Sequence, residues 1–230
     1  MVEPIVDDVL IDQVVRRVVE RLHHPQSTGF TQNPIGAADG RRMVPVSVSV
    51  RHVHLCREHL EILYGAGFDL EPRNPLYQPG EFASKQTVTL VGPRMRCLGD
   101  VRVLWPLRKG TQVEVSRTDA IYLGIDPPVM PSGKHEGSER LILVGPVGVV
   151  HLPCGVILAN RHVHLSTVSA EKWGLKDNQT IKIRIQTSKK TIFEDVQLRV
   201  NKAFLDEMHL DTDDGNAAGL RGGEMAEIID

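Results

Sequence analysis

The sequence predicts a mainly β protein made of many short strands, as in β-barrels and β-sandwiches. From Met43 onward, short segments rich in β-branched residues alternate with Gly or Pro, which is typical of such folds. These segments are VPVSVSV, KQTVTLVG, VRVLWP, QVEVS, RLILVG, VGVVHL, GVILAN, QTIKIRI and DVQLRV. Aromatic residues make up only 4% of the chain, so Val, Ile and Leu must fill the core.

Two segments that directly follow predicted strands have helical sequences. They are CREHLEILYGAG and STVSAEKWG. In the second, Ser166 or Ser169 is expected to cap the first turn.

Residues 4–24 have the pattern of one amphipathic helix. Apolar residues recur at steps of three and four and form one stripe, with acidic residues near its start and basic residues near its end. Pro25 stops the helix, and residues 25–42 are polar and rich in Gly and Pro, which predicts a flexible linker. The stripe therefore needs a partner. Either it docks on the body of the protein or pairs in an oligomer, or it is a detachable tag that binds a groove on another protein.

Composition narrows the class of protein. The formal net charge of −2 gives no general attraction to nucleic acid or to anionic membranes, and no apolar run approaches the length of a membrane span. The cysteines, Cys56, Cys97 and Cys154, are widely spaced and form no CxxC, which favours a reducing compartment over a disulfide framework. With no secretory signal pattern at the N-terminus, we expect a soluble, intracellular protein.

An internal repeat is the strongest signal in the sequence. RHVHL at residues 51–55 recurs letter for letter at residues 161–165, and each copy leads from a strand into a short helix. VEVSRTDAIYLG (113–124) aligns without gaps to MHLDTDDGNAAG (208–219). The chain is therefore expected to contain two copies of one unit.

Each copy of the repeat carries a candidate metal site. Residues i and i+2 of a strand point to the same face, so two histidines at this spacing can share one metal ion. The aligned segments place Glu114 opposite His209 as the third ligand. The predicted sets are His52, His54 and Glu114, and His162, His164 and His209. Nitrogen and oxygen ligands without cysteine fit zinc best, and three protein ligands leave a position open for catalysis.

Two arginines near the first set suggest anion binding. Arg102 and Arg108 flank Pro106 in VRVLWPLRKG, just before Glu114, and arginine forks match phosphate oxygens. They could equally be solvated strand arginines. After His209, the run DTDDGNAAG is read as a loop whose backbone N–H groups could bind a ligand.

Together these motifs resemble the PduL-type phosphotransacylases, the phosphate propanoyltransferases associated with bacterial microcompartments. The resemblance runs through SVSVRHVHL, KQTVTLVGP, VRVLWPLRKGTQVEVS, ANRHVHLS and MHLDTDDGNAAG, nearly the whole chain from residue 43. It implies two small β-barrels capped by short helices, with the active site between them. Residues 43–51 and 160–230 would form the first barrel and residues 52–159 the second, after an encapsulation-type helix (1–24) and a linker (25–42).

The resemblance also implies roles for individual residues. Two zinc ions per chain would be held by the two predicted sets, and Arg108 would bind phosphate as a catalytic residue. The expected coenzyme A contacts are Val48, Ser49, Val50, Arg94, Arg102 and Asn216.

The function implied is exchange of coenzyme A for phosphate on a short acyl group, with propanoyl first and acetyl or lactoyl as alternatives. We expect direct transfer without an acyl-enzyme. We also expect a location in the cytoplasm inside a bacterial microcompartment, with residues 4–24 binding shell or core proteins. The apolar helix favours a homo-oligomer, with a dimer as the expected state.

Two other classes compete with this interpretation. A cupin-like metal oxygenase would use the H-x-H-x3-E spacing formed by His52, His54 and Glu58, although the second copy has no such glutamate. A non-catalytic microcompartment scaffold would use the N-terminal helix but would leave six aligned ligands unexplained.

Overall fold

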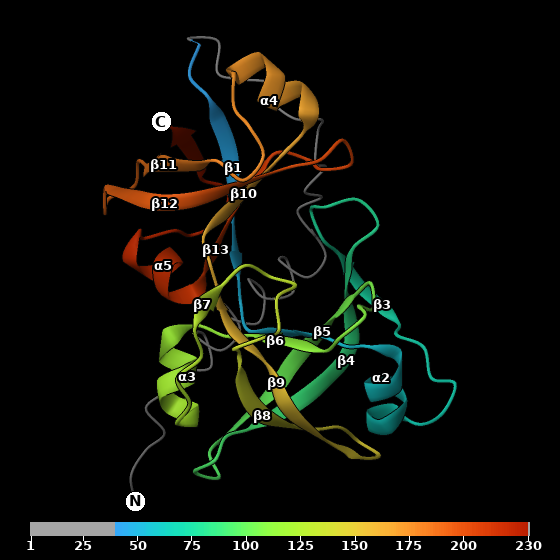
Figure 1. The fold of residues 1–230 in the computed structure, drawn as a ribbon. Coiled ribbons are helices and arrows are strands. Elements are labelled where there is room, and N and C mark those ends of the chain that lie inside the picture. Colours follow the sequence, from blue (N-terminus) through green and yellow to red (C-terminus); the bar gives the residue numbers. More distant parts are fainter. Residues whose placement is uncertain (1–39, 230) are drawn as a thin grey trace, which may run out of the picture. The chain divides into compact units, whose positions relative to one another are not determined.

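The computed structural model describes residues 40–229. The predicted helix at residues 4–24 and most of the predicted linker lie outside these residues. The described part is mainly β, with two closed six-stranded barrels and four short helices (Figure 1). This confirms the predicted fold class and decides between barrels and sandwiches.

The first barrel joins strands from both ends of the described chain. Its closed order is β1 (Met43–Ser49), β13 (Glu207–Asp211), β10 (His162–Leu165), β12 (Thr191–Val200), β11 (Thr180–Ile185) and β14 (Met225–Ile228). β1 pairs in parallel with β13 and antiparallel with β14, so the first described strand closes a barrel of late strands. Buried aliphatic side chains such as Ile183, Val196 and Leu198 fill its interior.

The second barrel is formed by the segment between β1 and β10. Its closed order is β4 (Phe82–Val91), β5 (Cys97–Trp105), β2 (His52–His54), β6 (Gln112–Glu114), β9 (Val149–Ala159) and β8 (Glu139–Val144), with β8 pairing back to β4. Two further strands, β3 (Pro72–Pro75) and β7 (Val129–Met130), add to β4 and β9. Val53, Val103, Val113 and Val156 are among its buried core residues.

The described helices begin directly after strands. α2 (Arg57–Tyr64) and α4 (Thr167–Trp173) are the two helices predicted from sequence, and Ser166 caps the second of them. α3 (Arg117–Leu123) and α5 (Thr212–Ala217) were not predicted, and the interpretation of DTDDGNAAG as a loop was wrong. The cause is local. Ser116 and Asp211 each accept a hydrogen bond from the backbone N–H three residues on, which starts a helix in sequences that otherwise read as turns.

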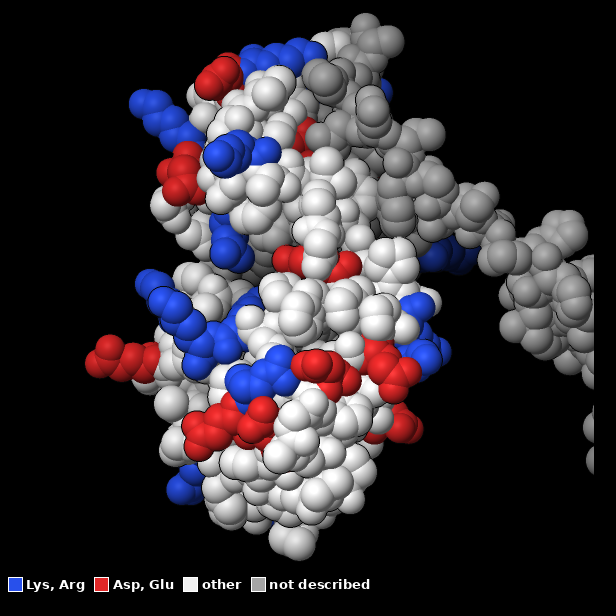
Figure 2. Space-filling view, turned by 90° about the vertical axis from the view of Figure 1, so that its right-hand side faces the viewer, with Lys and Arg blue, Asp and Glu red and all other residues white. Residues whose placement is uncertain are grey.

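Charged side chains of both signs are interspersed on the face shown in Figure 2. Ion pairs such as Arg57–Asp69 and Lys85–Glu71, both at 2.9 Å, link neighbouring elements at the surface. Among residues 40–229, no helix is long and apolar enough to cross a bilayer.

Candidate metal centre

The two RHVHL copies stand where the chain passes from one barrel to the other. β1 belongs to the first barrel and β2 to the second, while β9 belongs to the second and β10 to the first. Each crossing orients the first histidine in the same way. His52 Nδ1 lies 2.9 Å from the carbonyl oxygen of Val50, and His162 Nδ1 lies 3.0 Å from that of Asn160. Because Nδ1 is engaged by the backbone, Nε2 is the nitrogen left for another partner.

The third ligand of each predicted set lies on the neighbouring antiparallel strand. His52 is directly opposite Glu114 in β6, and His162 is directly opposite His209 in β13. The structure therefore brings both sets together, with one potential ligand atom of each residue within 4.8 Å of the others in its set. The members are His52, His54 and Glu114 in the first cluster, and His162, His164 and His209 in the second cluster.

The two clusters border one pocket. Its lining includes His52 and Glu114 from the first cluster and His162 and His209 from the second. Glu114 and His162 are also close enough to influence each other's ionisation. Side chains of both clusters, carried by strands of both barrels, therefore lie around one pocket.

Glu114 is the charged member of the first cluster. Its Oε2 lies 3.5 Å from His52 Nε2, and Ser132 Oγ approaches its Oε1 at 2.5 Å. Burial opposes ionisation of this carboxyl, but His52 and the Ser132 hydrogen bond outweigh burial and lower the pKa of Glu114. A buried carboxylate beside two imidazoles is a donor set suited to a divalent cation.

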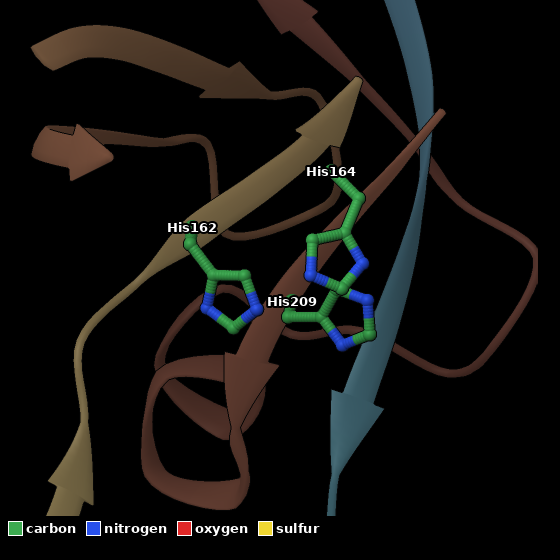
Figure 3. A group of neighbouring side chains, drawn as sticks. All are labelled: His162, His164 and His209. Carbon is green, nitrogen blue, oxygen red and sulfur yellow. The ribbon is translucent and has the colours of Figure 1, made fainter. Parts of the chain in front are cut away.

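The three imidazoles of the second cluster converge from β10 and β13 (Figure 3). Their ring centroids lie 4.7–5.0 Å apart. Burial and the neighbouring His209 lower the pKa of His164 to about 2 and that of His162 to about 4. Both rings are therefore neutral near pH 7, the form in which imidazole nitrogen can donate a lone pair to a metal.

Several imidazole nitrogens in the clusters are buried without a hydrogen-bond partner among the described residues. They are His54 Nδ1, both ring nitrogens of His164, and His209 Nε2. Unsatisfied buried polar atoms cost free energy, and a metal ion would satisfy one ring nitrogen of each histidine that binds it. The residues present therefore fit the zinc ions that the sequence predicts.

Arg108 lies beside the first cluster. Its Nη1 donates hydrogen bonds to Gln112 Oε1 at 3.0 Å and Ser132 Oγ at 2.8 Å, and lies 3.8 Å from Glu114 Oε1. Burial lowers the pKa of Arg108, although the nearby carboxylates oppose that effect. A second arginine, Arg199, pairs in register with His164 and contributes positive charge to the same region. Two guanidinium groups thus face the clusters and favour an anion there.

Four of the predicted coenzyme A contacts gather near the pocket or next to its lining. Ser49 lines the pocket, and the neighbouring Val48 and Val50 are 38% and 56% exposed. Val48 packs so closely on Gly215 in α5 that a Cβ there would lie 2.8 Å from it, which places Asn216 next to this edge of β1. Exposed aliphatic side chains of this kind can contact a ligand.

The other two predicted contacts do not line this pocket. Arg102 pairs in register with His52, but its Nη1 donates to the carbonyl oxygens of Ser84 and Lys85 at 3.1 and 2.7 Å. Arg94 does not line the pocket between the clusters. It lines a separate surface pocket together with Arg117 of α3.

Besides Arg199, four further residues near the clusters escaped the sequence analysis. They are Gln78, Gln112, Ser132 and Glu207. Gln112 and Glu207 stand two residues before Glu114 and His209, so the same i, i+2 rule that relates the histidines could have identified them. Gln78 and Ser132 lie in loops and carry no such signal.

Glu58 does not belong to either cluster. It is exposed in the first turn of α2. His52, His54 and Glu58 therefore do not form the metal site that the cupin-like alternative requires.

Comparisons with known proteins agree with this geometry. Residues 45–221 match the family described as phosphate propanoyltransferase. A phosphate propanoyltransferase of Thermotoga maritima is 47% identical over 80% of this chain and 88% of its own length. Those of Lachnoclostridium phytofermentans and Planctopirus limnophila are 40% and 44% identical over 97% and 95% of this chain, and over 100% and 90% of their own lengths. This chain belongs to the phosphate propanoyltransferase family of acyltransferases.

Proposed function

We propose that this chain exchanges coenzyme A for inorganic phosphate on a short-chain acyl group at a centre with two zinc ions. Propanoyl is the proposed acyl group, because it is the group in the names of the relatives. The observation that carries the proposal is the pair of buried ligand clusters bordering one pocket. His52, His54 and Glu114 would hold one ion, and His162, His164 and His209 the other.

Zinc bound in these clusters supplies a Lewis acid that stabilises a thiolate near neutral pH. The role proposed for Arg108 is to bind phosphate. Its guanidinium is held by Gln112 and Ser132, so its direction is fixed before phosphate arrives. Holding phosphate in one orientation converts an encounter between two molecules into a reaction within one complex.

The proposal includes direct transfer of the acyl group to phosphate. The phosphate oxygen forms a bond to the acyl carbon as the bond to the coenzyme A sulfur breaks, and the sulfur leaves as a thiolate. Support comes from the described lining of the pocket between the clusters, which contains no cysteine and whose one serine, Ser49, makes no hydrogen bond to a histidine. An acyl-enzyme would exchange labelled coenzyme A into propanoyl-CoA without phosphate, so the expected exchange under those conditions is none.

The activity is tested by phosphate-dependent release of free thiol from propanoyl-CoA. We expect release that requires phosphate, that stops after zinc is removed with a chelator, and that returns when zinc is restored. Acetyl-CoA and lactoyl-CoA, measured in parallel, test the choice of propanoyl. Thiol release that proceeds equally without phosphate would contradict the proposal.

We also propose that the enzyme works inside a bacterial microcompartment, as a dimer, with residues 4–24 binding shell or core proteins. Support comes from the apolar stripe and the charge pattern of that segment. Residues 1–42 fused to a fluorescent protein should co-purify with microcompartments from a host that makes them. A fusion in which the stripe is broken by Val14→Asp and Val18→Asp is the control and should not.

A further inference from the structure

Glu207 is a buried carboxylate that has no role in the proposed reaction. It is 2% exposed and stands in β13, opposite His164 and two residues before His209. Gln78 Nε2 donates a hydrogen bond to its Oε2 at 2.7 Å, and Ser47 Oγ donates to its Oε1. Both contacts are donors, which is the environment of an ionised carboxylate.

Glu207 also contacts a member of the second cluster, His209. Its Oε2 lies 2.9 Å from His209 Nε2, although the approach does not have hydrogen-bond geometry. None of Ser47, Gln78 and His209 carries a permanent positive charge. A buried carboxylate with such partners costs free energy unless a cation lies nearby.

The neighbouring carboxylate, Asp206, has a different role from Glu207. Asp206 is also buried, but it accepts hydrogen bonds from the backbone N–H of Ser166 at 2.7 Å and from the hydroxyl of Ser169. Asp206 therefore secures the start of α4. Glu207 secures no helix and instead contacts a member of the second cluster.

The internal repeat gives the comparison that assigns Glu207 a role. Its counterpart is Gln112, which stands opposite His54 and two residues before Glu114. The first cluster thus has a carboxylate as third member and an amide two residues earlier. The second cluster has an imidazole as third member and a carboxylate two residues earlier. Each half of the centre contains one buried carboxylate, at exchanged positions of the repeat.

We propose that Glu207 is a positioning residue of the second cluster, whose carboxylate lies against His209 Nε2 and supplies the negative charge that Glu114 supplies to the first. It does not belong to the second cluster itself, whose members are His162, His164 and His209. The inference rests on the proposed function, since it concerns the ion that this cluster would bind.

Zinc binding by the metal-free full-length protein tests the role separately from activity. The ion is titrated against a chromogenic chelator in two backgrounds, His52→Ala, which leaves the second cluster intact, and His162→Ala, which leaves the first. Glu207→Gln should weaken zinc binding about 10–100-fold in the first background, as loss of an outer partner does. It should leave binding unchanged in the second background.

Two further variants separate positioning from general destabilisation. Glu227→Gln is the matched control, because Glu227 stands in β14 of the same barrel and accepts a hydrogen bond from Arg184 at 3.0 Å. It should leave both affinities unchanged. Ser47→Ala removes one donor to Glu207 and keeps the charge, so it should weaken the second cluster alone, by less than Glu207→Gln.

The outcomes are distinct. Suppose that wild-type protein binds two zinc ions and that Glu207→Gln leaves the zinc affinity of the second cluster unchanged. That result would overturn this inference and leave the proposed function standing. Equal weakening of both clusters would also overturn it, by showing a structural effect. Wild-type protein that binds no zinc would overturn the proposed function as well.

Discussion

Arg161 holds Asp214 through two parallel hydrogen bonds, from Nε to Oδ2 at 2.8 Å and from Nη2 to Oδ1 at 2.9 Å. The repeat forms the same pair between Arg51 and Asp119, whose closest approach is 2.8 Å. Each arginine directly precedes the two histidines of its copy, and each aspartate lies in the first turn of the helix after the third cluster member. The pair therefore ties the strand that carries two members of a cluster to the helix that follows the third member.

Breaking the Arg161–Asp214 pair should lower stability modestly, because both side chains are partly exposed. We expect Arg161→Gln to cost about 0.5–1 kcal/mol and to lower the melting temperature by about 2–4 °C. A double-mutant cycle with Asp214→Asn, followed by thermal unfolding of metal-free protein, measures the coupling. Strictly additive losses would show that the two residues do not stabilise each other.

Replacing Arg108 should impair the use of phosphate. Arg108→Ala removes the guanidinium that Gln112 and Ser132 orient, and we expect kcat/KM for phosphate to fall about 10²–10³-fold. Arg108→Lys retains the charge without the fork and should recover only part of that loss. Arg73→Ala, at an exposed arginine of β3, is the control. Unchanged KM for phosphate together with unchanged turnover would remove the central role of Arg108.

The two clusters should bind their ions independently, so a variant that breaks one cluster should lose one ion. Elemental analysis of wild-type protein should find two zinc ions per chain, and His54→Ala or His164→Ala should each leave one, because each variant breaks a different cluster. His151→Ala is the control, since His151 is exposed on β9 and belongs to neither cluster. Protein that is fully active without stoichiometric metal would contradict the proposed centre.

Tyr64 should make stability depend on pH in the alkaline range. Burial raises the pKa of Tyr64 to about 12, and its hydroxyl donates to the carbonyl oxygen of Thr87 at 2.6 Å. In the unfolded chain a tyrosine ionises near pH ~10. The protonated Tyr64 hydroxyl therefore contributes its full stabilisation below that pH. This contribution is lost as the pH rises through the pKa of Tyr64 in the folded protein.

Urea unfolding across this range, with wild type and Tyr64→Phe, measures the effect. The fall in unfolding free energy with pH should be shallower in the variant. Tyr122→Phe, which removes an exposed hydroxyl on α3, is the matched control. Parallel curves for wild type and Tyr64→Phe would show that Tyr64 does not cause the slope.

The sequence predicted the strands and the convergence of the clusters because both depend on local patterns. Alternation and β-branched residues mark strands, and RHVHL fixes two histidines on one face. The alignment of Glu114 with His209 then identified the strand opposite each pair, which the register confirms. The boundaries predicted for the barrels, helix and linker stay predictions, as do the ligand roles of the individual residues.

The residues that escaped prediction are held by tertiary contacts. Ser132 reaches Glu114 from a loop 18 residues later in the chain, and Gln78 contacts Glu207 across a separation of 129 residues. Neither residue belongs to a periodic pattern, so only the fold brings them to the clusters. α3 and α5 were missed for another reason, because their short, polar sequences depend on single capping residues rather than on an apolar stripe.

The pairing of β1 has a consequence for synthesis on the ribosome. Its partners are β13 and β14, so the first barrel stays open until Met225 and the residues after it have been translated. The second barrel needs no strand beyond β9 and can close while translation continues. Nascent β1 must therefore wait unpaired beside a finished barrel, and the second cluster is complete only after β13, which carries His209, has emerged.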